Sequence, residues 1–322
     1  MHDTEESGKP RRDRSRVRLN GLPAEVTLYE VSPRDGLQNE SVVVPVAAKL
    51  ELISRLLGAG LRSLEVTSLV RPDRVPQLAD GDELLARLER PDGVRLGVLV
   101  PNLRGLERAM AASVREIAVF ASATESFAMA NLHRSRRDSM AIFAEVASKA
   151  RDAGMAVRGY VSMCFGDPDE GAVALGDVVA VVSELFDMGC YEVSVADTIG
   201  VAAPGQVHEL LDALDRAGID RGSIAVHFHD TYGQALANTL AALMGGVTTV
   251  DSSAGGLGGC PYAKSATGNL ASEDLVFMLD GLGIATGVDL AALVETSRWM
   301  AAQLGRPSPS RVVAAMGEET RL

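Results

Sequence analysis

Short runs rich in Val, Ile and Leu recur along the chain, and each run is bounded by polar or glycine-containing segments. A short continuous apolar run with such boundaries is typical of a strand that is buried on both faces, as in a parallel sheet. The pattern predicts eight strands in this way. They are 26–31, 63–68, 95–100, 116–122, 156–163, 191–196, 224–229 and 247–252.

The segments between these runs are longer and rich in Ala, Leu, Arg and Glu, which favours helices. Several are closed by a glycine, as at Gly60, Gly154 and Gly189, and glycine is typical of the position just after a helix. The predicted helices are 45–58, 80–89, 104–113, 137–153, 172–188, 204–217 and 232–245, with a further one at about 288–304 after the last strand.

Eight strands that alternate with helices predict the α/β class and a (β/α)8 TIM barrel, whose count and size the chain matches. An open doubly wound sheet is the main alternative. It would place a glycine-rich dinucleotide-binding turn after the first strand, and Ser-Pro-Arg-Asp-Gly (32–36) is not one. We therefore expect a disordered tail over residues 1–22 and a single barrel domain with C-terminal helices over 23–322.

Composition narrows the possible partners and the compartment. The net charge is −12, and no basic stripe follows the first twenty residues, so we expect no nucleic-acid partner. We find no run of about 18 apolar residues and expect no membrane contact. The polar, mixed-charge start does not resemble a secretory or transit segment, and three cysteines without metal-type spacing fit a reducing compartment. These features predict a cytoplasmic protein.

The strongest chemical signal is a His-x-His pair at the end of the seventh predicted strand. Residues i and i+2 of a strand point to the same face, so His227 and His229 should share one space. With Asp35 they make a two-histidine, one-carboxylate set, to which Asn269 could add an amide oxygen. Such a mixture suits Mg²⁺ or Mn²⁺. Structural zinc is not expected, because no thiolate is spaced to help.

Other polar residues fall in or at the ends of predicted strands, where barrel enzymes carry their catalytic groups. Buried charges are costly unless they are paired or bind a metal, so these residues should meet one another or a metal ion. One of them alone could be a helix cap, but the set as a whole favours a site. Its members are Arg34, Asp35, Glu65, Arg158, Asp197, Thr198, His227, His229 and Asn269.

A glycine-rich segment, Ala-Gly-Gly-Leu-Gly-Gly-Cys-Pro-Tyr (254–262), follows the eighth predicted strand. Glycine serves phosphate-binding loops, where backbone N–H groups approach an anion, and it also serves mobile loops. We favour a flexible loop that brings the Cys260 thiol to the site over a plain structural turn. Cys164 and Cys190 lie in or beside apolar runs and should be inert core thiols.

Together these residues resemble the hydroxymethylglutaryl-CoA lyases, a family of metal-dependent barrel lyases, over nearly the whole chain after residue 25. The resemblance implies that Asp35, His227, His229 and Asn269 bind the metal, and that Arg34 and Cys260 are catalytic with support from Glu65 and Asp197. We expect Arg34, Gln38, Arg158, Asp197 and Thr198 to bind substrate. The motifs that carry the resemblance are 32–40, 64–68, 75–80, 101–105, 157–162, 196–201, 227–238, 256–263 and 268–271.

The chemistry that the resemblance implies is a retro-Claisen cleavage of 3-hydroxy-3-methylglutaryl-CoA to acetoacetate and acetyl-CoA. Asp35 or His227 is placed to take the hydroxyl proton, and Arg34 can face the thioester oxygen, where negative charge develops. Cys260 could protonate the enolate carbon or relay a proton to it, while Glu65 orients Arg34 or a metal ligand. The catalytic set is thus Arg34, Asp35, Cys260, His227 and Glu65.

Two loops depart from the usual family pattern. The family usually has Pro-Lys-Trp where this chain has Pro-Asp-Arg (72–74), and Gly-Cys-Pro-Tyr where this chain has Gly-Asp-Pro-Asp (166–169). Both loops should lie at the substrate-facing end, so a related 3-hydroxy-3-alkylglutaryl-CoA is an alternative substrate.

A Claisen synthase of the isopropylmalate type shares Arg34, Asp35 and the two histidines, but it usually carries a further C-terminal regulatory region. A biotin carboxyltransferase needs a lysine at the metal, and no lysine falls in a predicted strand. A catalytically inactive barrel should have lost part of the metal set, and none of it is missing. We expect an acyl-CoA substrate and a metabolic role such as leucine breakdown. We also expect a homo-oligomer, either a dimer or a tetramer.

Overall fold

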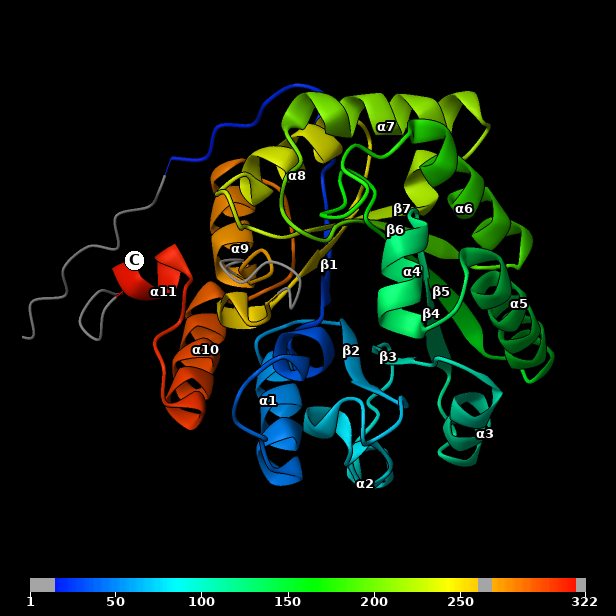
Figure 1. The fold of residues 1–322 in the computed structure, drawn as a ribbon. Coiled ribbons are helices and arrows are strands. Elements are labelled where there is room, and N and C mark those ends of the chain that lie inside the picture. The colour runs from blue at the N-terminus through cyan, green and yellow to red at the C-terminus, as the bar shows by residue number, and fades with distance from the viewer. Residues whose placement is uncertain (1–14, 260–267, 317–322) are drawn as a thin grey trace, which may run out of the picture.

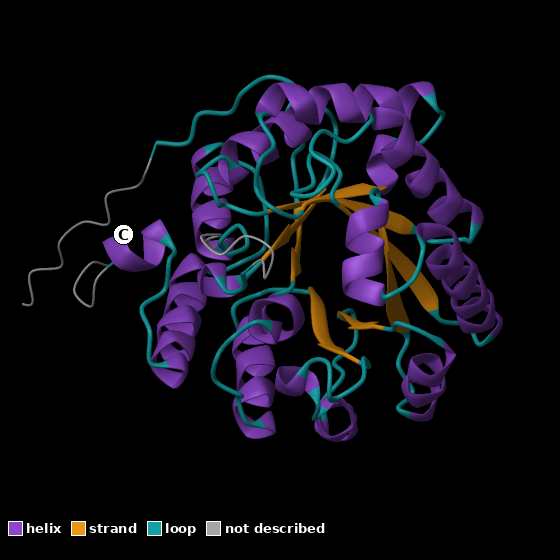
Figure 2. Cartoon of the chain, in the orientation of Figure 1, coloured by secondary structure: helices purple, strands orange, loops and turns teal. Residues whose placement is uncertain are grey.

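A computed structural model of the chain describes residues 15–259 and 268–316. Its eight strands are parallel and close into a barrel in chain order, because β8 pairs with β1. Figure 2 shows the strands as a ring at the centre of the molecule with helices outside it. The predicted (β/α)8 barrel is therefore confirmed. The strands are β1 (Thr27–Glu30), β2 (Ser63–Ser68), β3 (Arg95–Leu99), β4 (Glu116–Ser122), β5 (Ala156–Ser162), β6 (Glu192–Asp197), β7 (Ile224–Phe228) and β8 (Thr249–Ser252).

The helices surround this barrel (Figure 1). Each predicted helix is present with its ends shifted by a few residues, and three further helices were not predicted, namely α4, α9 and α11. The helices are α1 (Val46–Gly58), α2 (Gly81–Arg87), α3 (Leu103–Ala111), α4 (Glu125–Leu132), α5 (Arg136–Asp152), α6 (Leu175–Asp187), α7 (Pro204–Arg216), α8 (Ala235–Met244), α9 (Ser272–Gly281), α10 (Leu290–Leu304) and α11 (Arg311–Ala315).

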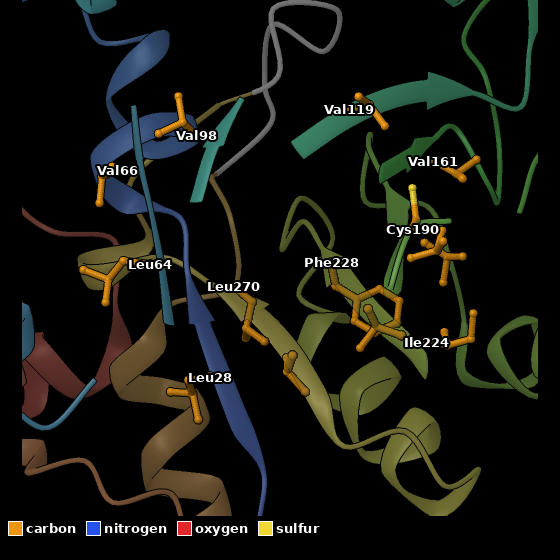
Figure 3. Close-up of a cluster of buried hydrophobic side chains, with 14 of the residues drawn as sticks. Leu28, Leu64, Val66, Val98, Val119, Val161, Cys190, Ile224, Phe228 and Leu270 are labelled. Carbon is orange, nitrogen blue, oxygen red and sulfur yellow. The ribbon is translucent and has the colours of Figure 1, made fainter. Parts of the chain in front are cut away.

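The main hydrophobic core joins the strands to the helices around them. Figure 3 shows side chains from successive strands in this layer, including Leu28, Leu64, Val98 and Val119. All four are almost fully buried. Burying apolar surface contributes roughly 25 cal/mol per Å², so this layer is a major source of the barrel's stability.

Charged and aromatic side chains, in contrast, fill part of the space inside the ring of strands. The Arg158 guanidinium lies over the Tyr29 ring at 4.0 Å, and the Tyr29 hydroxyl donates to Glu116 at 2.8 Å. A Cβ atom at Gly97 in β3 would come within 2.2 Å of that hydroxyl, so glycine is needed there. The barrel interior thus holds a polar layer, and the site described next adjoins it.

The segment expected to be a disordered tail, 1–22, is described only from residue 15. There the Val17 N–H donates to the Gly281 carbonyl at 3.0 Å, Arg16 pairs with Asp280, and Leu22 is buried. Residues 16–22 therefore contact the barrel domain, unlike the free tail that the polar composition suggested. Within the described ranges, no helix is long and apolar enough to cross a membrane.

Candidate metal and catalytic site

The first site residues lie just beyond β1, which ends at Glu30. Ser32–Gly36 form one π-helical turn, η1, directly after the predicted strand 26–31. Within this turn Arg34 donates from Nη1 to Asp35 Oδ1 at 2.7 Å and from Nε to Glu65 Oε2 at 2.5 Å. Glu65 lies in the middle of β2 with its side chain fully buried. Asp35 of η1 and Glu65 of β2 together fix the Arg34 guanidinium.

Asp35, His227 and His229 meet as the sequence predicted. Each of the three offers one possible ligand atom, and these atoms lie within 4.8 Å of one another. His227 is in β7, and His229 follows the strand and pairs with Asn269 through a backbone bridge. A carboxylate and two imidazoles at this separation suit a divalent cation.

Hydrogen bonds fix the ring orientation of both histidines. His229 places Nδ1 on the backbone carbonyl of Thr198, and His227 places Nδ1 at 3.3 Å from Asp251 Oδ2. In the neutral form of each ring, the nitrogen that faces an acceptor carries the proton, which leaves Nε2 with the free lone pair. Asp251 was not singled out from the sequence, although an acidic residue inside a buried strand is the signal that could have found it.

Asn269 contacts Asp35 at the carboxylate oxygen that Arg34 and Gln38 do not use. Its Nδ2 donates to Asp35 Oδ2 at 2.8 Å and to the Leu257 carbonyl at 3.0 Å. Its Oδ1 is buried and has no hydrogen-bond partner among the described residues. An orphaned amide oxygen beside a carboxylate and two imidazoles fits a bound cation, since such an oxygen is costly to bury alone.

The electrostatics of Asp35 and His229 suit metal binding, whereas the hydrogen bond to Asp251 outweighs burial and raises the pKa of His227. Burial raises the pKa of the Asp35 carboxyl, but the charges of Arg34, His227 and His229 outweigh burial and hold that pKa below its ordinary value. Burial and the neighbouring His227 lower the pKa of His229 to about 4. An ionised carboxylate and a neutral imidazole are the forms that bind metal, so both groups are prepared for it at neutral pH.

Gln38 lies beside Asp35 as expected, and its Nε2 donates to Asp35 Oδ1 at 2.9 Å.

Asp197 and Thr198 lie at the end of β6, and their side chains accept hydrogen bonds from the backbone of the protein. The Asp197 carboxylate accepts the backbone N–H groups of Val201 and Ala202, each at 2.9 Å. Burial raises the pKa of Asp197 to about 6. Thr198 Oγ1 accepts the Met163 N–H at 2.8 Å.

Arg158 differs most from its expected position. It is the third residue of β5 and fully buried, and its guanidinium pairs with Glu192 and Asp251 at 2.7 Å each. A side chain without exposed surface and with two carboxylate partners is poorly placed to hold a substrate. The geometry instead favours a supporting role within the barrel.

The described part of the glycine-rich segment contacts Asn269. Gly255, Gly256 and Gly258 all have positive φ, and a Cβ at Gly258 would lie 2.5 Å from Asn269 Nδ2. These glycines therefore let the backbone turn and pack closely on Asn269. Cys260 lies outside the described residues, so the prediction that its thiol is delivered to the site stays a prediction.

Of the other two thiols, Cys164 and Cys190 are both buried, as expected for core residues. Burial raises the pKa of each to about 12. We therefore expect brief iodoacetamide treatment of the native protein at pH 7.5 to modify Cys260 and to spare the other two, because the thiolate is the reactive form. Peptide mapping checks this, with Cys260→Ser as the control. Rapid labelling of Cys164 or Cys190 in the folded protein would contradict it.

The loop at 166–169 is held to the neighbouring loop by hydrogen bonds. Asp167 is buried and accepts from Thr124 Oγ1 at 2.6 Å and Ser126 Oγ at 2.9 Å. These hydroxyls and two loop N–H groups offset burial and hold the pKa of Asp167 below its ordinary value. This chain therefore uses a carboxylate to join the loops after β4 and β5, where the usual family pattern has a cysteine.

A closed eight-stranded α/β barrel with a carboxylate–dihistidine cluster beside its strand ends is typical of a barrel enzyme with a candidate metal site. A family model described as HMGL-like matches residues 25–300, and the chain belongs to that family.

The hydroxymethylglutaryl-CoA lyase, mitochondrial, of Arabidopsis thaliana is 49% identical over 296 residues, which cover 92% of this chain and 63% of that protein. The chain thus spans less than two thirds of that relative. The crystal structure of hydroxymethylglutaryl-CoA lyase from Pseudomonas aeruginosa has a TM-score of 0.90 and 47% identity, and the match covers 93% of this chain and 100% of that one. An HMG-CoA lyase from Acinetobacter baumannii, solved with coenzyme A and 3-methylmalate, has a TM-score of 0.87 and 36% identity over 93% of this chain and 97% of that one.

Proposed function

We propose that this chain is a carbon–carbon lyase that cleaves 3-hydroxy-3-methylglutaryl-CoA to acetoacetate and acetyl-CoA. The observation that carries the proposal is the placement of Arg34 against Asp35, next to His227 and His229. The site combines an acceptor for a hydroxyl proton, a fixed cation for a developing anion and a set of metal ligands. Family membership and the names of the relatives support the same activity.

The cofactor we propose is Mg²⁺ or Mn²⁺, held by Asp35, His227, His229 and Asn269 Oδ1. These oxygen and imidazole ligands suit both ions, and the choice between them is left to measurement. When bound, such a cation supplies Lewis-acid polarisation of the substrate oxygens and lowers the pKa of the hydroxyl.

We assign the proton transfers and the stabilisation of the developing charge to residues of the chain. Asp35 accepts the proton of the tertiary hydroxyl, because His227 carries a proton on the Nδ1 that faces Asp251 and would use Nε2 to bind the metal. A carbonyl then forms as the C2–C3 bond breaks, and the electron pair of that bond passes to the thioester as an enolate. Arg34 faces the thioester oxygen, where that negative charge develops. Cys260 gives its proton to the enolate carbon, or relays one to it, to yield acetyl-CoA.

Glu65 and Gln38 hold these groups in place. Glu65 fixes the Arg34 guanidinium through Nε, and Gln38 fixes Asp35 through Oδ1. Asp197, which is buried, shapes the turn beside His229, and the partly exposed Thr198 contacts the substrate. The supporting observations are hydrogen bonds: Glu65 to Arg34, and Gln38 to Asp35. Asp197 and Thr198 each accept a backbone N–H near the end of β6.

The substrate is a small acyl-CoA. A relative of closely similar fold was solved with coenzyme A and 3-methylmalate, and the bound coenzyme A supports an acyl-CoA substrate for this chain. The loops at 72–74 and 166–169 bear on the acyl group, and a related 3-hydroxy-3-alkylglutaryl-CoA is the alternative. A panel of these thioesters tests the choice. The largest kcat/KM should fall on the methyl compound, and a clear preference for a longer alkyl group would reassign the substrate.

Removing the metal should abolish cleavage. We expect treatment with EDTA to lower turnover of 3-hydroxy-3-methylglutaryl-CoA by roughly 10²-fold or more, because a metal Lewis acid contributes several kcal/mol to barrier lowering. Mg²⁺ or Mn²⁺ added in excess should restore it. Acetoacetate release is the assay, with magnesium and manganese content checked by elemental analysis. Full activity in protein shown to be free of metal would reject the metal-dependent mechanism.

We further propose a cytoplasmic location, a role in leucine breakdown and a homo-oligomer, either a dimer or a tetramer. Relatives of this chain include proteins named cytoplasmic and proteins named mitochondrial, so fractionation of the source cells is the direct test of location. Light scattering of the purified protein measures the oligomeric state.

A further inference from the structure

A buried charge network lies inside the barrel next to the two histidines. It joins Arg158 of β5 to Asp251 of β8 across the interior, and both side chains are fully buried. Arg158 donates from Nη2 to Asp251 Oδ1 at 2.7 Å and from Nη1 to Oδ2 at 3.3 Å. This two-point contact uses the planar fork of the guanidinium and fixes the plane of the carboxylate.

The arginine is itself fixed from other sides. Its Nε donates to Glu192 Oε1 at 2.7 Å, and its guanidinium lies 4.0 Å from the centre of the Tyr29 ring and 4.8 Å from that of Tyr160. Arg158 therefore has little freedom to turn. The guanidinium is therefore already oriented for its hydrogen bonds to Asp251.

Asp251 in turn faces His227. The two residues are register partners on the neighbouring strands β7 and β8, and Asp251 Oδ2 lies 3.3 Å from His227 Nδ1. The same oxygen accepts the Ser194 hydroxyl at 2.8 Å. The Arg158 guanidinium contacts both oxygens of Asp251, so the paired carboxylate acts as an acceptor. In the neutral His227 ring, Nδ1 therefore carries the proton and Nε2 holds the free lone pair.

We infer that Asp251, held by Arg158, is a positioning residue that sets the tautomer and orientation of the metal ligand His227. The inference rests on the metal set of the proposed function. His229 is oriented differently, by the backbone carbonyl of Thr198, so His227 is the ligand whose orientation depends on side chains. Two apolar side chains could fill the space of the ion pair without its desolvation cost, but neither could accept a hydrogen bond from Nδ1. This assignment replaces the substrate contact that we expected for Arg158.

The test is Asp251→Asn, with Glu192→Gln as the matched control. Each variant removes one carboxylate partner of Arg158, but only Asp251 contacts His227. We expect Asp251→Asn to weaken Mn²⁺ binding by about 10- to 100-fold, as is typical when an outer partner of a metal-bound histidine is lost. Glu192→Gln should stay within a few-fold of wild type. Titration of Mn²⁺ followed by electron paramagnetic resonance measures both, without substrate. Equal weakening in the two variants, or none in Asp251→Asn, would overturn the inference.

A second measurement on the unmodified protein covers the case in which Asp251→Asn does not fold. In metal-free protein labelled with ¹⁵N at histidine, taken to alkaline pH so that the ring is neutral, His227 should keep its proton on Nδ1. The ring is assigned by comparison with His227→Gln. A neutral His227 that is protonated on Nε2 would overturn the inference. Neither readout needs cleavage of any acyl-CoA, so failure of the proposed reaction is detected separately.

Discussion

Replacing Arg34 with lysine should lower kcat by roughly 10²- to 10³-fold, the usual effect of losing one donor to a developing oxyanion. Arg34 makes two hydrogen bonds at once, through Nε to Glu65 and through Nη1 to Asp35. A guanidinium can do this and still offer Nη2 to a thioester oxygen. The lysine ammonium is a single point at the end of a flexible stem, so it keeps the charge and loses the fork.

Metal binding by Arg34→Lys should change much less than turnover, because Arg34 is not among the candidate ligands. Steady-state kinetics and Mn²⁺ titration on the same preparation separate the two effects. The matched control is Arg87→Lys on α2, which alters an exposed pair with Glu83 and should leave both quantities near wild type. A kcat for Arg34→Lys close to that of the control would remove Arg34 from the mechanism.

The parts of the fold that the sequence predicted well are those that depend on local pattern. All eight strands appear where apolar runs predicted them, since a strand buried on both faces must be apolar throughout. The metal set could also be predicted. The two-residue period of a strand puts His227 and His229 on one face, and the closed barrel brings Asp35 to them.

Contacts across the barrel could not be predicted in this way. Arg158 lies near the start of β5 and pairs with Asp251, and the registers of several strands decide this, which no local pattern encodes. The contact between Asp251 and His227 also depends on strand register and could not be predicted from local sequence. Nor does the apolar run of the first strand reveal that η1 follows it, the turn from which Arg34 reaches Glu65.

The unpredicted helices have local explanations. In α4 the apolar residues are nearly consecutive instead of following one face, so the pattern lacks the helical period. α9 begins just after Asn269 and the glycine-rich segment, where turn signals dominate the local sequence. The glycines of that segment suggested a mobile loop. In the part the structure describes, Gly258 instead allows close packing on Asn269.

Removal of a candidate ligand should have a still larger effect than the change at Arg34. We expect Asp35→Ala and His229→Ala to weaken Mn²⁺ binding by at least about 100-fold, because losing a ligand should exceed the 10- to 100-fold typical of its outer partners. Turnover should fall in parallel, and excess Mn²⁺ should restore part of it. Asp35→Ala should remain the slower enzyme at saturating metal, since the variant also loses a partner of Arg34 and a possible proton acceptor.

The control for these two variants is His208→Ala, which removes an exposed histidine from α7. It should bind Mn²⁺ as wild type does, and the thermal midpoints of all three variants should show that the barrel is folded. His229 has its Nδ1 on a backbone carbonyl and is in no ion pair among the described residues, so its loss subtracts a ligand atom without leaving a buried charge unpaired. Tight, stoichiometric Mn²⁺ binding that survives both Asp35→Ala and His229→Ala would show that the metal is held elsewhere, and the proposed mechanism would fall with it.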